Sequence, residues 1–198
     1  MQFVPAYFPS IDYFAQLVNH SVTFCIHSHY QKQTYRNRCS IYGANGKLNL
    51  CIPIKHSKSG NHQQDIDVQI HYENDWQKNH WRSIESAYRS SPFFEFYEDE
   101  LSAVFFQTEE KLVQYNLNLI QCISDWLSTE IQYTLSKSYI PLTKKEEELI
   151  KAKGIRENKH PSYTQVFHNK HGFINNLSIL DLVFNLGPSS KTYLEQIA

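Results

Sequence analysis

The sequence lacks any long apolar run, since no window approaches the roughly 18 consecutive apolar residues of a membrane-spanning helix. It also lacks an N-terminal charged region followed by an apolar run, which is the pattern of a secretory signal. Neither charge sign is in excess, because 19 Lys and Arg stand against 20 Asp and Glu. No overall field therefore favours nucleic acid or an anionic membrane. We expect a cytoplasmic protein with no membrane span and no nucleic-acid partner.

Four common catalytic motifs are also missing. The chain has no GxGxxG, GxxxxGK[ST], HExxH or GxSxG sequence, so the usual dinucleotide, phosphate-loop, zinc-protease and hydrolase-elbow devices are excluded. The cysteines form no C-x-x-C pair and no zinc spacing, and we expect them to be reduced core residues. They are Cys25, Cys39, Cys51 and Cys122.

Histidines occur in two close pairs, His27-x-His29 and His168-x-x-His171. Neither pair has a carboxylate at ligand spacing, and solvated or hydrogen-bonded histidines are the more common explanation. We therefore predict neither a metal nor a cofactor.

Aromatic residues, by contrast, are abundant. They make up 14% of the 198 residues, with 13 Tyr and 12 Phe. A tyrosine-rich core explains this most simply, although tyrosines also suit a ligand pocket, because they bring a polar tip to an apolar wall. The length suits a single domain spanning residues 1–198, and no composition break argues for a second.

One predicted helix, residues 75–89, concentrates aromatic and titratable side chains. At 3.6 residues per turn, Trp76, His80, Ile84 and Tyr88 share a face, and Pro92 prevents the helix from continuing. His80 thus lies in an apolar stripe, where burial would lower its pKa and leave a neutral base. A core histidine bonded to the backbone is an equal alternative.

The N-terminal third predicts an α/β beginning. An apolar segment at residues 1–4, a helix capped by Ser10 and a buried strand at 22–26 imply a parallel pair joined by a right-handed crossover. Ligands in such folds lie beyond the carboxyl ends of the strands, here residues 5–9 and 27–32.

The next third predicts antiparallel pairing. Asn45-Gly46 indicates a type I′ hairpin, which would place Cys39 opposite Ile52 and Cys51 opposite Ser40. The alternation over residues 65–72 predicts another strand. We therefore predict a three-layer α/β domain with a mixed sheet and helices on both faces, with α+β as the alternative.

Caps and periodicity define the later helices. An apolar stripe over residues 112–127 indicates a core helix beginning after Thr108. Thr143 and Glu146 form a capping box, and Ser178 caps a short apolar helix that ends at Gly187.

Residues 30–38 form a donor-rich loop. If it runs extended into the next strand, Arg36 and Arg38 project to one side, with Ser40 and Tyr42, away from the core. Two guanidinium groups there would bind a carboxylate or phosphate. The alternative is a solvated edge with surface ion pairs to Asp65 or Glu73.

Six segments taken in order resemble the WbqC-like protein family, and together they span nearly the whole chain. They are Tyr7-Phe-Pro9, Tyr30-Gln-Lys-x-x-Tyr-Arg-Asn-Arg38, Leu50-x-Ile-Pro-Ile54, His80-Trp-Arg-Ser-Ile-Glu-Ser-Ala-Tyr88, Ser91-Pro-Phe-Phe-Glu-Phe-Tyr97 and Asn176-Leu-Ser-Ile-Leu-Asp-Leu-Val-Phe-Asn185. Members are often encoded in bacterial surface-polysaccharide (O-antigen) loci, and the family has no settled mechanism. The resemblance implies a pathway rather than a reaction.

Two functions follow as expectations. One is a transferase acting on a nucleotide-activated sugar or an aminoacyl or acyl donor, with His80 as the catalytic base around an anion-binding cleft. The other is a non-catalytic module that binds a glycan intermediate or a pathway enzyme. The expected substrate-binding residues are Tyr7, Tyr30, Lys32, Arg36, Asn37, Arg38, Trp81, Arg82 and Tyr88.

Overall fold

The computed structural model describes residues 1–55, 63–152 and 160–197. The strands are β1 (Gln2–Phe3), β2 (Val22–Phe24), β3 (Arg38–Gly43), β4 (Gly46–Cys51) and β5 (Tyr133–Leu135). The helices, with 3-10 helices marked η, are α1 (Ile11–Asn19), η2 (Asp65–Asp67), α2 (Trp76–Tyr88), α3 (Phe94–Phe105), α4 (Leu112–Trp126), α5 (Lys144–Ile150), α6 (His168–His171), α7 (Ile179–Leu186), η3 (Gly187–Ser189) and α8 (Ser190–Gln196). Within those described ranges, none of the helices is long and apolar enough to cross a membrane.

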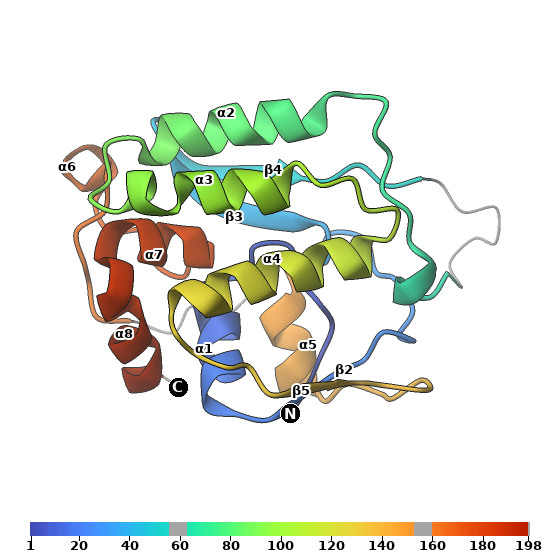
Figure 1. The fold of residues 1–198 in the computed structure, drawn as a ribbon. Helices are drawn as coiled ribbons and strands as arrows, with labels where there is room; N and C mark the ends of the chain where they lie inside the picture. The colour runs from blue at the N-terminus through green and yellow to red at the C-terminus, as the bar shows by residue number, and fades with distance from the viewer. Residues whose placement is uncertain (56–62, 153–159, 198) are drawn as a thin grey trace.

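The strands are divided between two sheets. Strands β1, β2 and β5 form a parallel sheet in the order β1-β2-β5, whereas β3 and β4 form an antiparallel hairpin. Helices α1, α4 and α5 lie between the parallel sheet and the hairpin, and α2 lies above the hairpin (Figure 1). The α/β class, with parallel and antiparallel strands, is therefore confirmed, and the two kinds of pairing are kept apart by a helical layer.

The predicted N-terminal β-α-β unit is confirmed. Strands β1 and β2 pair in parallel, with Phe3 opposite Phe24. Between them Ser10 caps α1, because its side chain accepts a hydrogen bond from the backbone N–H of Tyr13. The carboxyl ends of β1 and β2 thus lead toward residues 5–9 and 27–32, where a ligand was expected.

The predicted caps of the later helices are also present. Thr143 and Glu146 form both hydrogen bonds of the capping box at the start of α5. The Ser178 side chain accepts from the N–H of Leu180 at the start of α7. Helix α4 begins at Leu112 rather than after Thr108, because Lys111 is still extended.

The hairpin forms with a register different from the expected one. Gly43 pairs with Gly46, so that the turn residues are Ala44 and Asn45, and Arg38 pairs with Cys51. Gly46 has φ +96°, which is the conformation that follows a type I turn in a bulged hairpin, rather than part of a type I′ turn. Because the pairing moves by two residues, Cys51 faces Arg38 and not Ser40.

The strand predicted over residues 65–72 is wrong. Residues 65–67 form η2, and only isolated bridges follow, from Ile70 to Ile54 and from Gln69 to Lys111. The alternation that suggested a strand is nevertheless real, since Val68 and Ile70 are buried. An irregular extended segment can bury alternate side chains in this way without a continuous ladder.

Candidate functional site

Arg36 lies in the interior, not on an exposed strand edge. Its side chain is 2% exposed, as is that of Asp65, and Arg36 Nε donates to Asp65 Oδ1 at 2.8 Å. The expected projection beside Arg38 is wrong, because residues 35–37 form a turn and β3 begins only at Arg38. Ser40 and Tyr42, expected to point away from the core, are buried too, and Tyr42 donates its hydroxyl proton toward the carbonyls of Phe167 and Gly172.

The buried ion pair leaves acceptor capacity unused. Asp65 Oδ2 has no hydrogen-bond partner among the described residues, and neither does the buried hydroxyl of Ser28. Burial raises the pKa of Asp65 to about 6, and the adjacent Arg36 guanidinium opposes that shift. Ser28 follows the carboxyl end of β2, and Asp65 lies beside it, since the Asp65 N–H donates to the Ser28 carbonyl at 2.8 Å.

Cys51 is exposed, and the expectation that it belongs to the core is wrong. Directly paired residues of an antiparallel hairpin share a face, with Cβ atoms about 4.5–5.5 Å apart, so the Cys51 thiol and the Arg38 side chain are neighbours. Asn37, which is buried, donates from Nδ2 to Cys51 Sγ at 3.4 Å and to the Ile52 carbonyl at 2.8 Å. The end of the hairpin therefore gathers a thiol, an amide and a guanidinium.

Tyr30 interacts electrostatically both with these groups and with the ion pair. Burial raises the pKa of its phenol to about 12. Cys51 and Asp65 raise this pKa further, whereas Arg36 and Arg38 lower it. These six residues are called the Cys51 cluster below. They are Tyr30, Arg36, Asn37, Arg38, Cys51 and Asp65.

His80 forms a separate, buried pair with Tyr7 behind the same hairpin. Tyr7 is fully buried, and its hydroxyl lies 3.0 Å from His80 Nδ1. Burial raises the Tyr7 pKa well above its usual value, so the phenol keeps its proton and donates it to Nδ1. Burial also lowers the pKa of His80 to about 4, and a hydrogen bond to the backbone of Cys51 opposes the shift only in part. The imidazole is neutral at pH 7, as expected, but both of its nitrogens are engaged inside the protein.

The other expected binding residues are dispersed. Lys32 and Arg82 are exposed. Trp81 packs against Phe105 and Phe106, with ring centroids 5.6 and 5.5 Å away. Tyr88 is fully buried, and its hydroxyl accepts from the Tyr42 N–H at 3.1 Å. The structure therefore gathers Tyr30, Arg36, Asn37 and Arg38, and places the Tyr7–His80 pair near them through Cys51.

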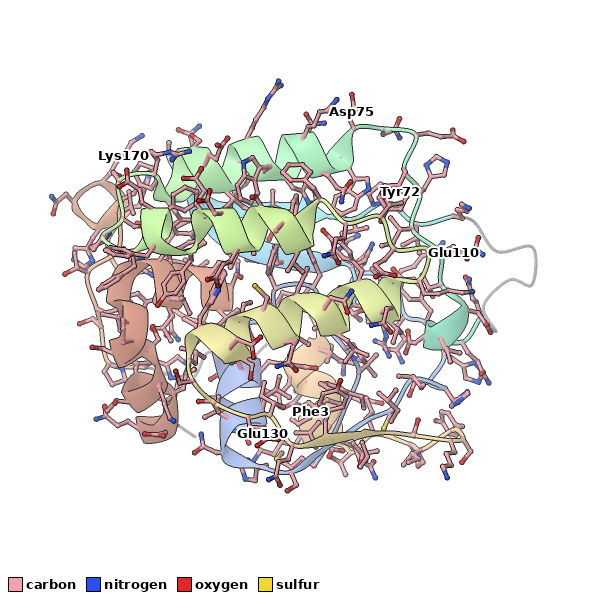
Figure 2. All side chains as sticks on the ribbon, viewed as in Figure 1. Phe3, Tyr72, Asp75, Glu110, Glu130 and Lys170 are labelled. Carbon is pink, nitrogen blue, oxygen red and sulfur yellow. The ribbon has the colours of Figure 1, made fainter. Side chains whose placement is uncertain are left out.

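Two surface hollows lie away from this cluster. One, of about 530 Å³, lies between α3 and α4, and the other, of about 540 Å³, includes Tyr72 and Glu110, both labelled in Figure 2. The first lining mixes acidic, amide and apolar groups, the second includes Lys55 and His71 beside two glutamates, and neither includes a residue expected at the site. Within the described ranges, no group of three or more His, Cys, Asp or Glu residues is arranged to hold a metal ion.

Asp181 is a second buried carboxylate, and it serves the fold. It is fully buried and accepts from the Tyr163 hydroxyl at 2.5 Å and from Gln165 Nε2 at 2.8 Å. Burial raises its pKa to about 6, and these hydrogen bonds oppose the shift. The network joins α7 to the segment before α6.

This carboxylate predicts a pH dependence of stability. Because its folded pKa lies above the unfolded value, the folded state binds the extra proton, and the contribution of Asp181 to stability falls as the pH rises from about 4 to about 6. Asp181→Asn should remove that part of the slope, which is worth about 1–3 kcal/mol. Urea unfolding of both proteins at pH 4.5, 5.5 and 6.5 measures it, with exposed Asp125→Asn as the control. Parallel curves for wild type and Asp181→Asn would contradict the assignment.

Sequence reasoning missed Cys51 and Asp65 as members of the cluster. Cys51 was assigned to the core with the other cysteines because they fit no C-x-x-C or zinc spacing, and the expected hairpin register placed it opposite Ser40 instead of Arg38. Asp65 was considered only as a surface partner of the arginines. The Gly43-Ala44-Asn45-Gly46 turn, with its two glycines, allowed the observed register, and choosing it would have placed Cys51 opposite Arg38.

The chain is similar to known proteins over most of its length. The model of the "WbqC-like protein family" matches residues 4–157 and 150–193. The chain belongs to the WbqC-like protein family. A relative described as "Uncharacterized protein Rv1507c", from Mycobacterium tuberculosis (strain ATCC 25618 / H37Rv), is 25% identical over 197 residues, covering 83% of each chain. No solved structure matches this WbqC-like chain.

Proposed function

We propose that this WbqC-like protein is a cytoplasmic group transferase in bacterial surface-polysaccharide biosynthesis, acting on an activated sugar or on an aminoacyl or acyl donor that carries an anionic group. One observation supports this above the others. Arg38 is half-exposed, no described carboxylate forms an ion pair with it, and its buried Nε has no hydrogen-bond partner among the described residues. An arginine held in this way is prepared for an anion from outside, such as a phosphate or carboxylate.

The neighbouring residues hold Arg38 in place but add no net charge to the site. The Arg36–Asp65 pair is neutral overall and fixes the loop that precedes Arg38. Tyr30 keeps its phenolic proton and offers a half-buried ring and a hydroxyl donor within electrostatic range of Arg38. Lys32, Trp81 and Arg82 retain their proposed part as more distant contacts for a large donor.

His80 enters the proposal as a positioning residue. Its ring is 8% exposed and sits between the Tyr7 hydroxyl and the Cys51 backbone. From there it fixes the end of β4, and with it the Cys51 thiol, instead of reaching a substrate proton directly. This burial is also what favours the second candidate, a non-catalytic module binding a glycan intermediate or a pathway enzyme.

Arg38→Ala should weaken the binding of the correct donor by about ten- to a hundred-fold, because a charge-assisted arginine contact contributes roughly 1.5–3 kcal/mol. The free energy of unfolding should change little, because the side chain is half-exposed. A thermal-shift screen of nucleotide sugars, coenzyme A thioesters and aminoacyl esters identifies the donor class, and calorimetric titration then measures the variant.

Two further variants sharpen this test. Arg38→Lys should recover only part of the affinity, because a point charge cannot replace a planar fork. Arg89→Ala, an exposed arginine paired with Glu85 and Glu98, should bind as the wild type does. Equal losses in Arg38→Ala and Arg89→Ala would exclude Arg38 as the anion site. If a donor binds but no tested acceptor gives turnover, the non-catalytic module is the better explanation.

A further inference from the structure

Cys51 differs chemically from the other three cysteines. Cys25, Cys39 and Cys122 are buried, whereas Cys51 is exposed. Burial raises the pKa of Cys25, raises that of Cys39 well above its usual value and raises that of Cys122 to about 12. A thiolate is the nucleophilic form of cysteine, so these three are inert at neutral pH. Cys51 alone of the four is accessible.

The surroundings of this thiol contain groups with unused hydrogen-bonding capacity. Asn37, 5% exposed, donates to Sγ from Nδ2, yet its own Oδ1 has no hydrogen-bond partner among the residues described. Arg38 Nε, on the same face of the hairpin, is also buried without a partner in that part of the chain. Buried polar atoms are nearly always paired in native proteins. An orphaned amide oxygen and an orphaned guanidinium N–H beside one exposed sulfur point to a ligand with both a donor and an anionic or carbonyl acceptor.

We propose that Cys51 is the nucleophile that accepts the acyl group from an acyl thioester of coenzyme A, with Arg38 binding a phosphate of the donor. This inference rests on the proposed transferase function and narrows its donor to acyl thioesters. Asn37 donates a hydrogen bond to the Cys51 sulfur, and Arg38 is paired with Cys51 across the hairpin, so the thiol and the guanidinium can contact one donor molecule together. Coenzyme A carries the phosphates for Arg38 and the thioester for Cys51 in one molecule.

The proposed chemistry balances without an oxidant. The Cys51 thiol loses its proton to solvent, and the thiolate sulfur bonds to the carbonyl carbon of the donor. The bond from that carbon to the coenzyme A sulfur breaks, and its electron pair leaves with the coenzyme A thiolate, which takes up a proton. An amine acceptor then attacks the Cys51 thioester. The carbon–sulfur bond breaks with its electron pair going to the Cys51 sulfur, an amide forms, and the proton lost by the amine is taken up by that sulfur, which restores the Cys51 thiol.

Thiol reactivity tests the arrangement without any donor. Iodoacetamide is neutral and iodoacetate is anionic, so the ratio of their alkylation rates reports the charge beside the sulfur. Relative to free glutathione, Cys51 should favour iodoacetate by about tenfold, as expected for one cation a few ångströms away in a partly screened setting. Arg38→Gln should abolish that preference, and Cys51→Ser should abolish labelling. A glutathione-like ratio in the wild type would overturn the proposal.

Trapping tests the covalent step. Wild-type protein incubated with acetyl-, malonyl- and 3-hydroxybutyryl-coenzyme A should gain one acyl group on Cys51 with at least one of them, as shown by intact mass and peptide mapping. Adding an amine such as an amino sugar should discharge the adduct. Cys51→Ser should still bind coenzyme A thioesters but show at least a thousandfold lower turnover, in line with losses on removing a catalytic nucleophile.

The outcomes separate this inference from the proposed function. If Cys51→Ser transfers groups as fast as wild type, Cys51 is not the nucleophile, yet the transferase proposal stands. If thioesters stabilise the protein and no adduct forms on Cys51, the covalent step is also excluded. If nucleotide sugars bind and thioesters do not, the donor assignment fails and Arg38 remains an anion site.

Discussion

Asp65→Ala should destabilise the protein by about 3–5 kcal/mol at pH 7.5, because it leaves the Arg36 guanidinium charged and without its partner in the interior. Both side chains of the pair are 2% exposed, and the 2.8 Å bond is the only one the structure gives to Arg36 Nε among the described residues. The free energy of unfolding in urea measures the loss. A loss of that size would make this one of the most sensitive positions in the chain.

An exposed ion pair in the same protein provides the control. Arg89 bonds Glu98 at 2.6 Å, but the arginine is 50% exposed. Glu98→Ala should therefore lower stability by less than about 1 kcal/mol, as surface pairs usually do. Replacing the buried pair by Arg36→Met with Asp65→Leu should be far less damaging than Asp65→Ala alone, because no charge is then left unpaired. If Asp65→Ala and Glu98→Ala behave alike, Arg36 must reach solvent, as the surface alternative required.

Gly187→Ala should be nearly as damaging, with a loss of about 2–5 kcal/mol from two separate causes. Gly187 ends α7 with φ +54°, a conformation that L residues rarely adopt. A Cβ there would also lie 2.5 Å from two ring carbons of Phe93. The Phe93 N–H is bonded to the Phe184 carbonyl at 3.0 Å, which holds the Phe93 backbone in place, so only a change of the side-chain rotamer would relieve the clash. Thermal and urea unfolding measure the effect.

Gly46 is a control that separates the backbone cause from the steric cause. It has φ +96°, but apart from its chain neighbours no heavy atom of the described residues lies within 4 Å of the position its Cβ would take. Gly46→Ala should therefore lose only the backbone part, about 1 kcal/mol, and Gly46→Val somewhat more. Introducing Gly187→Ala into a Phe93→Ala background should remove the steric part of its effect. Equal losses at Gly46 and Gly187 in the wild-type background would show that the Phe93 contact contributes nothing.

The sequence predicted the parts of the fold that are decided within a few residues. The Ser10 cap of α1, the Thr143 and Glu146 capping box and the Ser178 cap all formed where they were expected. The buried stripe of α2 was also predicted, and with it the depressed pKa of His80. Local hydrogen bonds and helical periodicity depend on residues that are close together in the sequence. They can therefore be predicted without knowing what packs around the helix.

The candidate site could be predicted only in part. The donor-rich loop beyond the second strand was found, because an α/β crossover places such loops at one edge of a sheet. The different positions of the two arginines were not predicted. A turn at residues 35–37 directs the Arg36 side chain into the interior and leaves Arg38 half-exposed. Asp65 was named, with Glu73, only as a surface partner of the arginines; that it is buried with Arg36 could not be predicted, because 29 positions separate the two residues.

The sequence by itself determined the family, the α/β class, the N-terminal β-α-β unit and the helix caps. Tertiary structure alone decided the hairpin register, the separation of the two sheets and the burial of the Arg36–Asp65 pair. The physical reason is that a register shift of two residues keeps every side chain on the same face as before, so alternation cannot distinguish the two pairings. In the folded protein α2 and the segment near α6 pack against the hairpin in the observed register, and that register places Cys51 beside Arg38.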